Sequence, residues 1–313
     1  MRSYSLLAPA KINLYLEILG DRPDGFHELV MLLQSIDLCD RIDLHPNGTD
    51  AVRIYCQDPQ VPLDQTNSAY QAAQVMFESY PETYANYGGI DITIEKNIPV
   101  AAGLAGGSCD AAAVLVGINL MWQLGLTQPE LQILAARVGS DVPFCVSGGT
   151  AIATGRGEKL DPIPDLNNLA IVLAKYRSLS IAAAWAYQRY KQQFSESYVR
   201  DPDAILSRSA QVHSGPLVKA VIKKNGELIG QLLYNDLERV VLSAFPQVAH
   251  LRETLQSLGG LGTVMSGSGP TVFSLCETRA EAQQIQQQLR ASIPDPDLEI
   301  WTAQLIGNGI AVA

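Results

Sequence analysis

The amino-acid sequence predicts an α+β fold built in two halves. The first fifty or so residues are rich in β-strand patterns, whereas helix and strand patterns alternate through the rest of the chain. At 161–165 the sequence reads Asp-Pro-Ile-Pro-Asp, which is typical of a joint between domains. With 313 residues, the chain is also longer than one hydrophobic core of roughly 100–150 residues usually serves. We therefore expect two domains, at 1–160 and 161–313.

The N-terminal part predicts four strands before any helix. Alternating apolar residues mark a strand over 4–19, and a turn at 21–25 leads into a second strand at 26–37. Two shorter strands follow at 39–45 and 51–56. A sheet at the start of the chain is therefore expected.

Helices and strands alternate in the middle of the chain. Asn67, within Thr-Asn-Ser, can cap a helix that runs through 72–76. The other elements expected here are a strand at 90–95, a helix from the glycine-rich segment 103–107 to about 124, a helix at 129–138, and strands with a turn over 142–153.

The C-terminal part mixes the two element types again. Strands are expected at 171–174, 264, 272–275 and 299–306, and helices at 181–195, 216–235, 246–258 and 280–290.

Composition excludes several classes of function. A formal net charge of -10 argues against non-specific nucleic-acid binding, which depends on Lys and Arg contacts to phosphates. The five cysteines form no C-x-x-C pair, so neither a zinc site nor a disulfide framework is indicated. The N-terminus breaks its apolar run at Pro9 and Lys11, too early for a signal peptide. We expect a cytoplasmic protein without a membrane span.

The glycine-rich segment 99–108 is the clearest candidate for a binding site. Glycines between a strand and a helix let backbone N–H groups approach an anion at the positive end of the helix dipole. Ser108 can cap the helix or offer its hydroxyl to a phosphate or a metal ion. No Lys follows these glycines as in a P-loop, and the G-x-G-x-x-G spacing is absent. The alternative is a tight loop that binds nothing.

Three segments in order resemble the GHMP kinases, which include galacto-, homoserine, mevalonate and phosphomevalonate kinases. They are Pro-Ala-Lys-Ile-Asn-Leu at 9–14, the loop at 99–108, and Met-Ser-Gly-Ser-Gly-Pro-Thr at 265–271. The resemblance implies a ribosomal-S5-like N-terminal domain, a GHMP C-terminal α+β domain, and an active site in the cleft between them. It also implies ATP and Mg²⁺ as cofactors and a small-molecule substrate. From the acidic charge and the lack of a long apolar stretch, we expect no nucleic-acid or membrane partner.

The resemblance implies a set of nucleotide-binding residues. They are Pro99, Val100, Ala101, Ala102, Gly103, Leu104, Ala105, Gly106, Gly107, Ser108 and Cys109, with Lys96 and Asn67 near the adenine. The match departs at two positions, because Ala105 stands where many members have Gly and Cys109 where Ser is usual. A hydroxyl contact from position 109 is therefore not available.

The resemblance makes Asp141 the catalytic base and Lys11 its partner. Phosphoryl transfer to an alcohol needs charge stabilisation around the γ-phosphate and an acceptor for the hydroxyl proton. A nearby Lys keeps an Asp ionised, so the pair is chemically consistent. The alternative is that Asp141 is a turn residue and Lys11 an exposed charge on an edge strand.

The blocks at 22–29 and 139–144 resemble one branch of the family, which phosphorylates a cytidine diphosphate conjugate of methylerythritol in the non-mevalonate route to isoprenoid precursors. There Phe26 and Tyr187 would stack on the cytosine, His27 would read its edge, and Asn13 would contact the substrate. Alternatively Phe26 is a core residue, His27 a surface residue, and Trp185 or Tyr190 takes the place of Tyr187. A homoserine or mevalonate type of kinase and a non-catalytic ligand-binding protein are the other functions considered.

Overall fold

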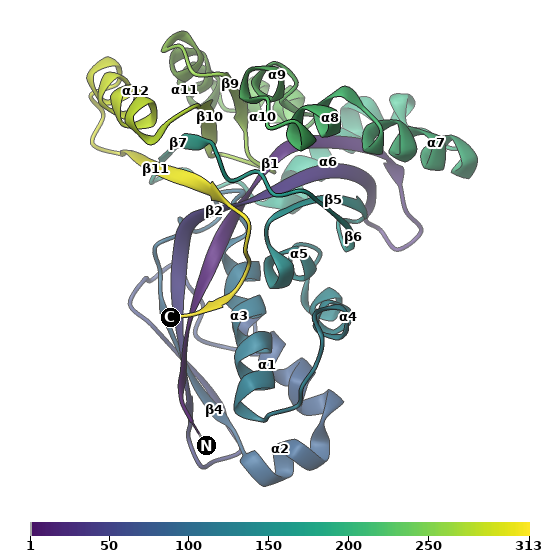
Figure 1. The fold of residues 1–313 in the computed structure, drawn as a ribbon, viewed down its shortest axis with the longest axis vertical. Coiled ribbons are helices and arrows are strands. Elements are labelled where there is room, and N and C mark those ends of the chain that lie inside the picture. The colour runs from purple at the N-terminus through teal and green to yellow at the C-terminus, as the bar shows by residue number, and fades with distance from the viewer. Residues whose placement is uncertain (1) are drawn as a thin grey trace.

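A long antiparallel hairpin organises the N-terminal half of the structure, a computed structural model that describes residues 2–313. Its strands β1 (Tyr4–Asp21) and β2 (His27–Pro46) run side by side through the middle of the molecule (Figure 1). The other strands of this half are β3 (Val52–Cys56), β4 (Ile90–Glu95), β5 (Thr150–Gly155) and β6 (Lys159–Ile163).

Helices cover one face of this sheet. They are α1 (Ser68–Ser79), α2 (Pro81–Tyr87), α3 (Gly106–Met121), α4 (Gln128–Val138) and α5 (Val142–Ser147). The apolar helix α3 packs on β1 and β2, and Gly117 allows the close approach because a Cβ there would lie 2.2 Å from Cδ1 of Leu44 in β2. Alternate residues of β1, including Ala10 and Ile12, face this core and are fully buried. Lys11 and Asn13 therefore face the opposite way, since strand side chains alternate.

One continuous sheet joins the two halves. Its main path runs β12-β1-β2-β11-β7-β10-β9, with β7 (Ala170–Tyr176), β9 (Gly262–Met265), β10 (Val272–Cys276), β11 (Leu298–Ile306) and β12 (Ala311–Val312). The two-residue strand β8 (Tyr234–Asn235) pairs with β1. The end of the chain thus returns to the first strands, as the yellow segment in Figure 1 shows. The segment 161–165, which we expected to join two domains, lies largely in β6 and pairs with β5. The division into domains at 1–160 and 161–313 stays a prediction.

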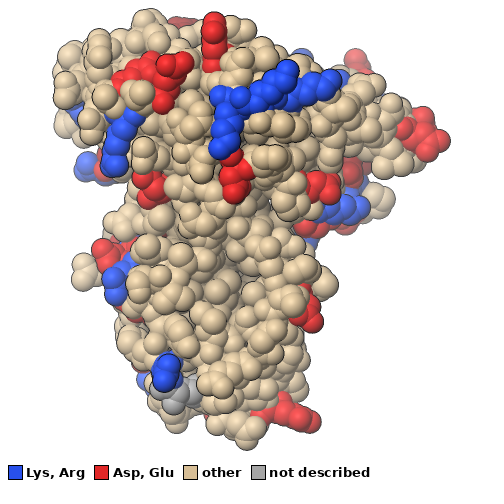
Figure 2. Space-filling view, in the orientation of Figure 1, with Lys and Arg blue, Asp and Glu red and all other residues tan. Residues whose placement is uncertain are grey.

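The C-terminal helices form the upper part of the molecule in Figure 1. They are α6 (Ala183–Phe194), the short 3-10 turn Ser195–Ser197, α7 (Pro202–His213), α8 (Pro216–Ile222), α9 (Gly226–Gln231), α10 (Glu238–Ala244), α11 (Pro246–Ser257) and α12 (Arg279–Ser292). On the face in Figure 2, charged side chains of both signs gather on this upper part, and most of the lower part is uncharged. Among the described residues, no helix has the length and apolar character needed to cross a membrane.

Three sequence-based expectations about the fold are wrong. The expected strands at 26–37 and 39–45 are one strand, β2. The segment 142–147 is the helix α5 and not a strand, because Pro143 suits a first helical turn and Gly148 ends the helix with a positive φ of 62°. The helix expected over 216–235 is divided into α8, α9 and β8.

Candidate active site

A cavity of about 860 Å³ lies between the two halves of the fold. Its walls come from β1, β2, the segment 60–68, the glycine-rich loop, the start of α5, and α6. This volume is in the range of small-molecule and cofactor sites. Most of the side chains singled out from the sequence line this cavity, from segments far apart along the chain.

The glycine-rich loop forms one end of the cavity. Ala101, Gly103 and Ala105 have positive φ angles of 51°, 75° and 58°, and α3 begins directly afterwards at Gly106. A left-handed backbone conformation suits glycine best, so alanine is the less favourable residue at positions 101 and 105. With an apolar residue at its N-cap, α3 has no side chain that caps its first amides. These amides are available to an anionic ligand.

The second glycine-rich turn, at 265–271, packs directly against the first. A Cβ on Gly103 would lie only 2.2 Å from the carbonyl oxygen of Ser266, and the Ser266 hydroxyl donates to the Gly103 carbonyl at 3.1 Å. The side-chain amide of Asn235 stabilises this turn, because its Nδ2 donates to the carbonyls of Met265 and Gly267 at 2.7 and 2.8 Å. The two turns therefore form one backbone surface, and Gly103 has no room for a side chain.

A pair formed by a buried Lys and a partly exposed Asp lies beside this backbone surface. Lys11 Nζ donates to Asn13 Oδ1 at 2.7 Å and lies 3.5 Å from Asp141 Oδ2. Lys11 is 4% exposed, whereas the Asp141 side chain is 31% exposed and lines the cavity. Asp141 precedes α5 without a side-chain capping bond, so its carboxylate is free to face Lys11. The pair has the residues and the position needed to take a proton from a hydroxyl held in the cavity.

Asn67 and Lys96 also line the nucleotide end of the cavity. The Asn67 side chain caps α1 by accepting from the Ala69 amide at 2.8 Å, and it donates to the Pro62 carbonyl at 2.7 Å. Lys96 is already engaged with two carboxylates, Asp40 and Asp110. Its ammonium is thus not a free phosphate ligand.

Aromatic residues form the other end of the cavity. Phe26 is 46% exposed, and the rings of His27 and Tyr187 stack with centroids 5.2 Å apart. Burial lowers the pKa of His27 despite the Asp21 carboxylate nearby, and its Nε2 is buried with no hydrogen-bond partner among the described residues. Burial and then the charge of Asp141 raise the pKa of Tyr187, whose ring lines the same cavity as Lys11 and Asp141. Because nearly half of its surface is exposed, Phe26 is not a core residue.

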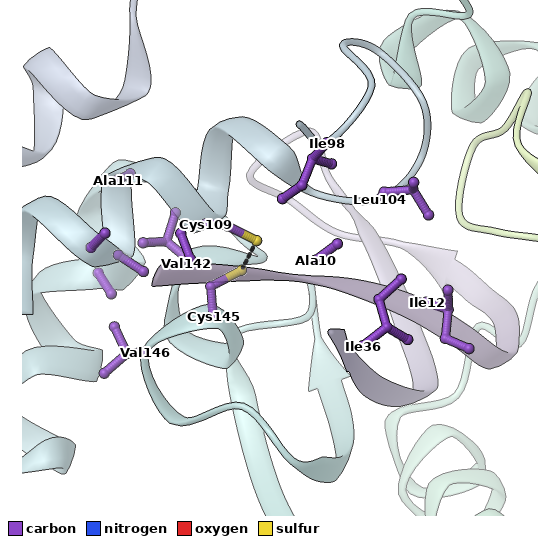
Figure 3. Close-up of a cluster of buried hydrophobic side chains, with 14 of the residues drawn as sticks. Ala10, Ile12, Ile36, Ile98, Leu104, Cys109, Ala111, Val142, Cys145 and Val146 are labelled. Carbon is purple, nitrogen blue, oxygen red and sulfur yellow. Dashed lines mark hydrogen bonds between the residues drawn. The ribbon is translucent and has the colours of Figure 1, made fainter. Parts of the chain in front are cut away.

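Two side chains expected at the nucleotide lie elsewhere. Cys109 is fully buried beneath the start of α3, where its sulfur lies 3.3 Å from that of Cys145 (Figure 3). Leu104 is also buried in this cluster, and its carbonyl accepts from the Lys11 amide at 3.2 Å. Neither residue lines the cavity, and both side chains pack beneath the loop. Their assignment as nucleotide-binding residues stays a prediction.

Several further residues line the cavity without any signal in the local sequence. The most notable is Arg156, whose guanidinium lies 4.9 Å from the centre of the Phe26 ring and donates to the Ala136 carbonyl at 2.6 Å. Lys191, on α6, pairs with Asp21 at 3.0 Å. No local motif surrounds either residue, and only the fold brings them to the cavity.

Family models confirm the class of protein that this fold and cavity indicate. The N-terminal domain model of the GHMP kinases matches residues 67–149, and the C-terminal model matches residues 217–295. A solved homoserine kinase from Cytophaga hutchinsonii has the same fold, with a TM-score of 0.75 at 21% identity over 100% of this chain and 98% of that chain. The protein is an ATP-dependent small-molecule kinase.

Curated relatives narrow this class. A 4-diphosphocytidyl-2-C-methyl-D-erythritol kinase from Gloeothece citriformis is 63% identical over 312 residues, which span 100% of this chain and 99% of the relative. One from Synechocystis sp. is 56% identical, with the same coverage. A solved 4-(cytidine 5'-diphospho)-2C-methyl-D-erythritol kinase is 30% identical, with a TM-score of 0.73 over 97% of this chain and 100% of that chain. The chain belongs to the 4-diphosphocytidyl-2-C-methyl-D-erythritol kinase family.

Proposed function

We propose that the protein transfers the γ-phosphate of ATP to the 2-hydroxyl of 4-diphosphocytidyl-2-C-methyl-D-erythritol, with Asp141 as base and Lys11 as its partner. The observation that carries this proposal is the Lys11–Asp141 pair, with 3.5 Å between Nζ and Oδ2, at a cavity that the glycine-rich loop also lines. The names of the relatives that share nearly the whole chain support the choice of substrate.

The proposed reaction uses few groups of the protein. The Asp141 carboxylate accepts the hydroxyl proton while the substrate oxygen forms a bond to the γ-phosphorus, and the bond from that phosphorus to the β–γ bridging oxygen breaks to release ADP. The Lys11 ammonium, 3.5 Å from Asp141, offsets negative charge on the transferring group. Asn13 orients Lys11 through their 2.7 Å hydrogen bond and lies beside the substrate.

The two ends of the cavity divide the ligands in this proposal. Backbone amides at 99–108 bind the phosphates of ATP, with Asn67 near the adenine. Phe26 and Tyr187 hold the cytosine ring by stacking, and His27 donates or accepts at its edge. A stacking site suits a substrate with a nucleobase such as cytosine, whereas homoserine and mevalonate contain no nucleobase.

We also propose that Mg²⁺ binds in the cavity mainly through the phosphates of the nucleotide. Among the described residues, no three His, Cys, Asp or Glu side chains gather as a metal site. This fits Mg²⁺, which commonly keeps several waters and binds through substrate phosphates and few protein groups. The Ser108 hydroxyl lines the cavity and would contribute to holding the ion. When bound, Mg²⁺ neutralises charge on the β- and γ-phosphates. We also place the protein in the cytoplasm, since its five free cysteines suit a reducing compartment.

The test is ADP release by the purified protein with ATP and Mg²⁺. The acceptors offered in parallel are 4-diphosphocytidyl-2-C-methyl-D-erythritol, homoserine, mevalonate and galactose. We expect turnover with the cytidine conjugate alone. Turnover with another acceptor would contradict the aromatic base site, and binding of ATP without turnover on any acceptor would support a non-catalytic protein.

A further inference from the structure

A buried charge network lies directly under the glycine-rich loop. Lys96 follows β4, and its ammonium donates to Asp40 of β2 and, at 2.8 Å, to Asp110 of α3. The side chains of Lys96, Asp40 and Asp110 are 6%, 0% and 4% exposed. Three ionisable groups at this depth require strong mutual pairing, because removing charges from water is costly.

The network holds both ends of the loop. Asp40 Oδ1 accepts the backbone amides of Asn97 and Ile98 at 2.6 and 2.8 Å, just before the loop begins. Asp110 lies in the first turns of α3, just after the loop ends. A single ammonium, that of Lys96, therefore ties the entry and the exit of the loop to the same strand.

The Lys96 ammonium also lies directly against the start of α3. A Cβ added to Gly106, the first residue of the helix, would lie 3.0 Å from Lys96 Nζ and 3.1 Å from Ile98 Cγ2. Between these anchors, Ala101 and Ala105 hold left-handed conformations that are unfavourable for residues other than glycine. Backbone strain of this kind persists only where the surrounding structure over-determines it.

Two members of the network reach the wall of the cavity. Asp110 and Lys96 line the cavity, and Asp110 Oδ1 is buried without a hydrogen-bond partner among the described residues. Burial raises the pKa of Asp110 to about 8, although the charge of Lys96 opposes this rise. Burial alone would lower the pKa of Lys96, but the two carboxylates outweigh this effect and raise it. A change in the charge of the network thus alters the cavity where the loop meets α3.

We propose that Asp40, Lys96 and Asp110 are positioning residues for the nucleotide, because they hold the loop in the shape in which its amides meet the phosphates. This inference rests on the proposed binding of ATP by the loop. It changes the role expected for Lys96, whose ammonium acts through the loop and does not need to touch the nucleotide.

The experiment compares wild type with Asp40→Asn and Asp110→Asn, which keep the shape of each side chain and replace its carboxyl group by an amide. We expect KM for ATP to rise about ten-fold or more, since small misplacements of a binding group have large effects. KM for the acceptor is expected to stay within two-fold. The dissociation constant for ATP, measured by calorimetry without acceptor, should rise in parallel.

The matched control is Thr150→Val. Thr150 is 1% exposed, bonds Gln34 and the Leu166 amide, and does not line the cavity. This variant should lose stability without a change in KM for ATP. If Asp40→Asn and Asp110→Asn change KM for ATP no more than this control, or raise both KM values together, the network has only a structural role and the proposal is wrong. The calorimetric result is independent of the acceptor, so it separates this proposal from the choice of substrate.

Discussion

The two ends of the cavity are built in different ways. The nucleotide end consists mainly of backbone, since the turns at 99–108 and 265–271 touch each other through carbonyls, amides and glycines. The acceptor end consists of side chains, and its rings come from the β1–β2 connection and from α6. Lys11 and Asp141 lie where the two ends meet.

This difference decides how each end tolerates change. A backbone surface depends on close packing, so one added methyl group at the wrong place displaces a whole turn. A ring in an exposed wall, such as Phe26, can be replaced with loss of its stacking energy alone. Substitutions at the nucleotide end should therefore affect ATP binding and folding together, whereas those of the stacking rings at the acceptor end should affect binding of the acceptor and not of ATP.

The largest effect is expected where the two ends meet. Lys11→Met keeps the apolar stem and removes the charge next to Asp141, so kcat should fall by about 10²–10³. Lys175→Met is the matched control, because Lys175 is 3% exposed but donates only to the carbonyls of Tyr176 and Arg177, outside the cavity. Steady-state kinetics should show a loss in the first variant and wild-type kcat in the second. Equal losses would place the effect in stability and not in chemistry.

At the nucleotide end, Gly103→Ala should abolish measurable ATP binding. The new Cβ would lie 2.2 Å from the Ser266 carbonyl oxygen, so the two turns must separate. Gly125→Ala isolates the cost of a positive φ, because Gly125 has φ 68° and no atom within 4 Å of the added Cβ. Calorimetry with ATP should show normal binding in this control. Normal ATP binding in Gly103→Ala would contradict the contact between the turns.

At the acceptor end, Tyr187→Leu and Phe26→Leu should each raise KM for the cytidine conjugate by roughly 5- to 150-fold, the range that about 1–3 kcal/mol of stacking implies. KM for ATP should not change. Tyr55→Leu is the control, since Tyr55 is 47% exposed, much like Phe26 at 46%, but does not line the cavity. An increase in KM for ATP in the Phe26 or Tyr187 variant would show that the two ends are not separate.

A smaller effect is expected from Ala105→Gly. Ala105 has a φ of 58°, and relief of this conformation should stabilise the protein by about 1 kcal/mol. The same substitution at Ala112, in the middle of α3, should destabilise it by a similar or larger amount. Urea unfolding of both variants tests the sign, and destabilisation by Ala105→Gly would contradict the left-handed geometry of the loop.

The smallest effect concerns pH. Burial lowers the pKa of His27 below its ordinary value of 6.5, so the unfolded chain binds this proton first as the solution becomes acidic. The contribution of His27 to stability is therefore intact above pH 6.5 and decreases as the pH falls from there towards the lowered pKa. In His27→Asn, urea unfolding should show a weaker loss of stability over this window. His250→Gln, at an exposed site, should retain the wild-type profile, and an unchanged profile in His27→Asn would contradict the assignment.

The sequence was more informative about the nucleotide end than about the acceptor end. Glycines mark backbone geometry directly, so the loop at 99–108 and its contact with a helix start could be predicted from local sequence alone. The burial of Cys109 could not, because which face of α3 meets the sheet depends on tertiary packing. Arg156 and the Asp40–Lys96–Asp110 network were also not predictable, since their partners lie 14 to 130 positions away along the chain. The helix α5 was not predictable for another reason: a short apolar run has no clear periodicity, so it fits a strand as well as a helix.

The most direct test of the proposed catalytic role is the turnover of Asp141→Asn with ATP, Mg²⁺ and 4-diphosphocytidyl-2-C-methyl-D-erythritol. This substitution keeps the size of the side chain beside Lys11 and removes the proton acceptor. We predict that kcat falls by about 10²–10⁴ while both ligands still bind with dissociation constants close to those of wild type. A kcat within a few-fold of wild type would contradict the role of Asp141 as the base.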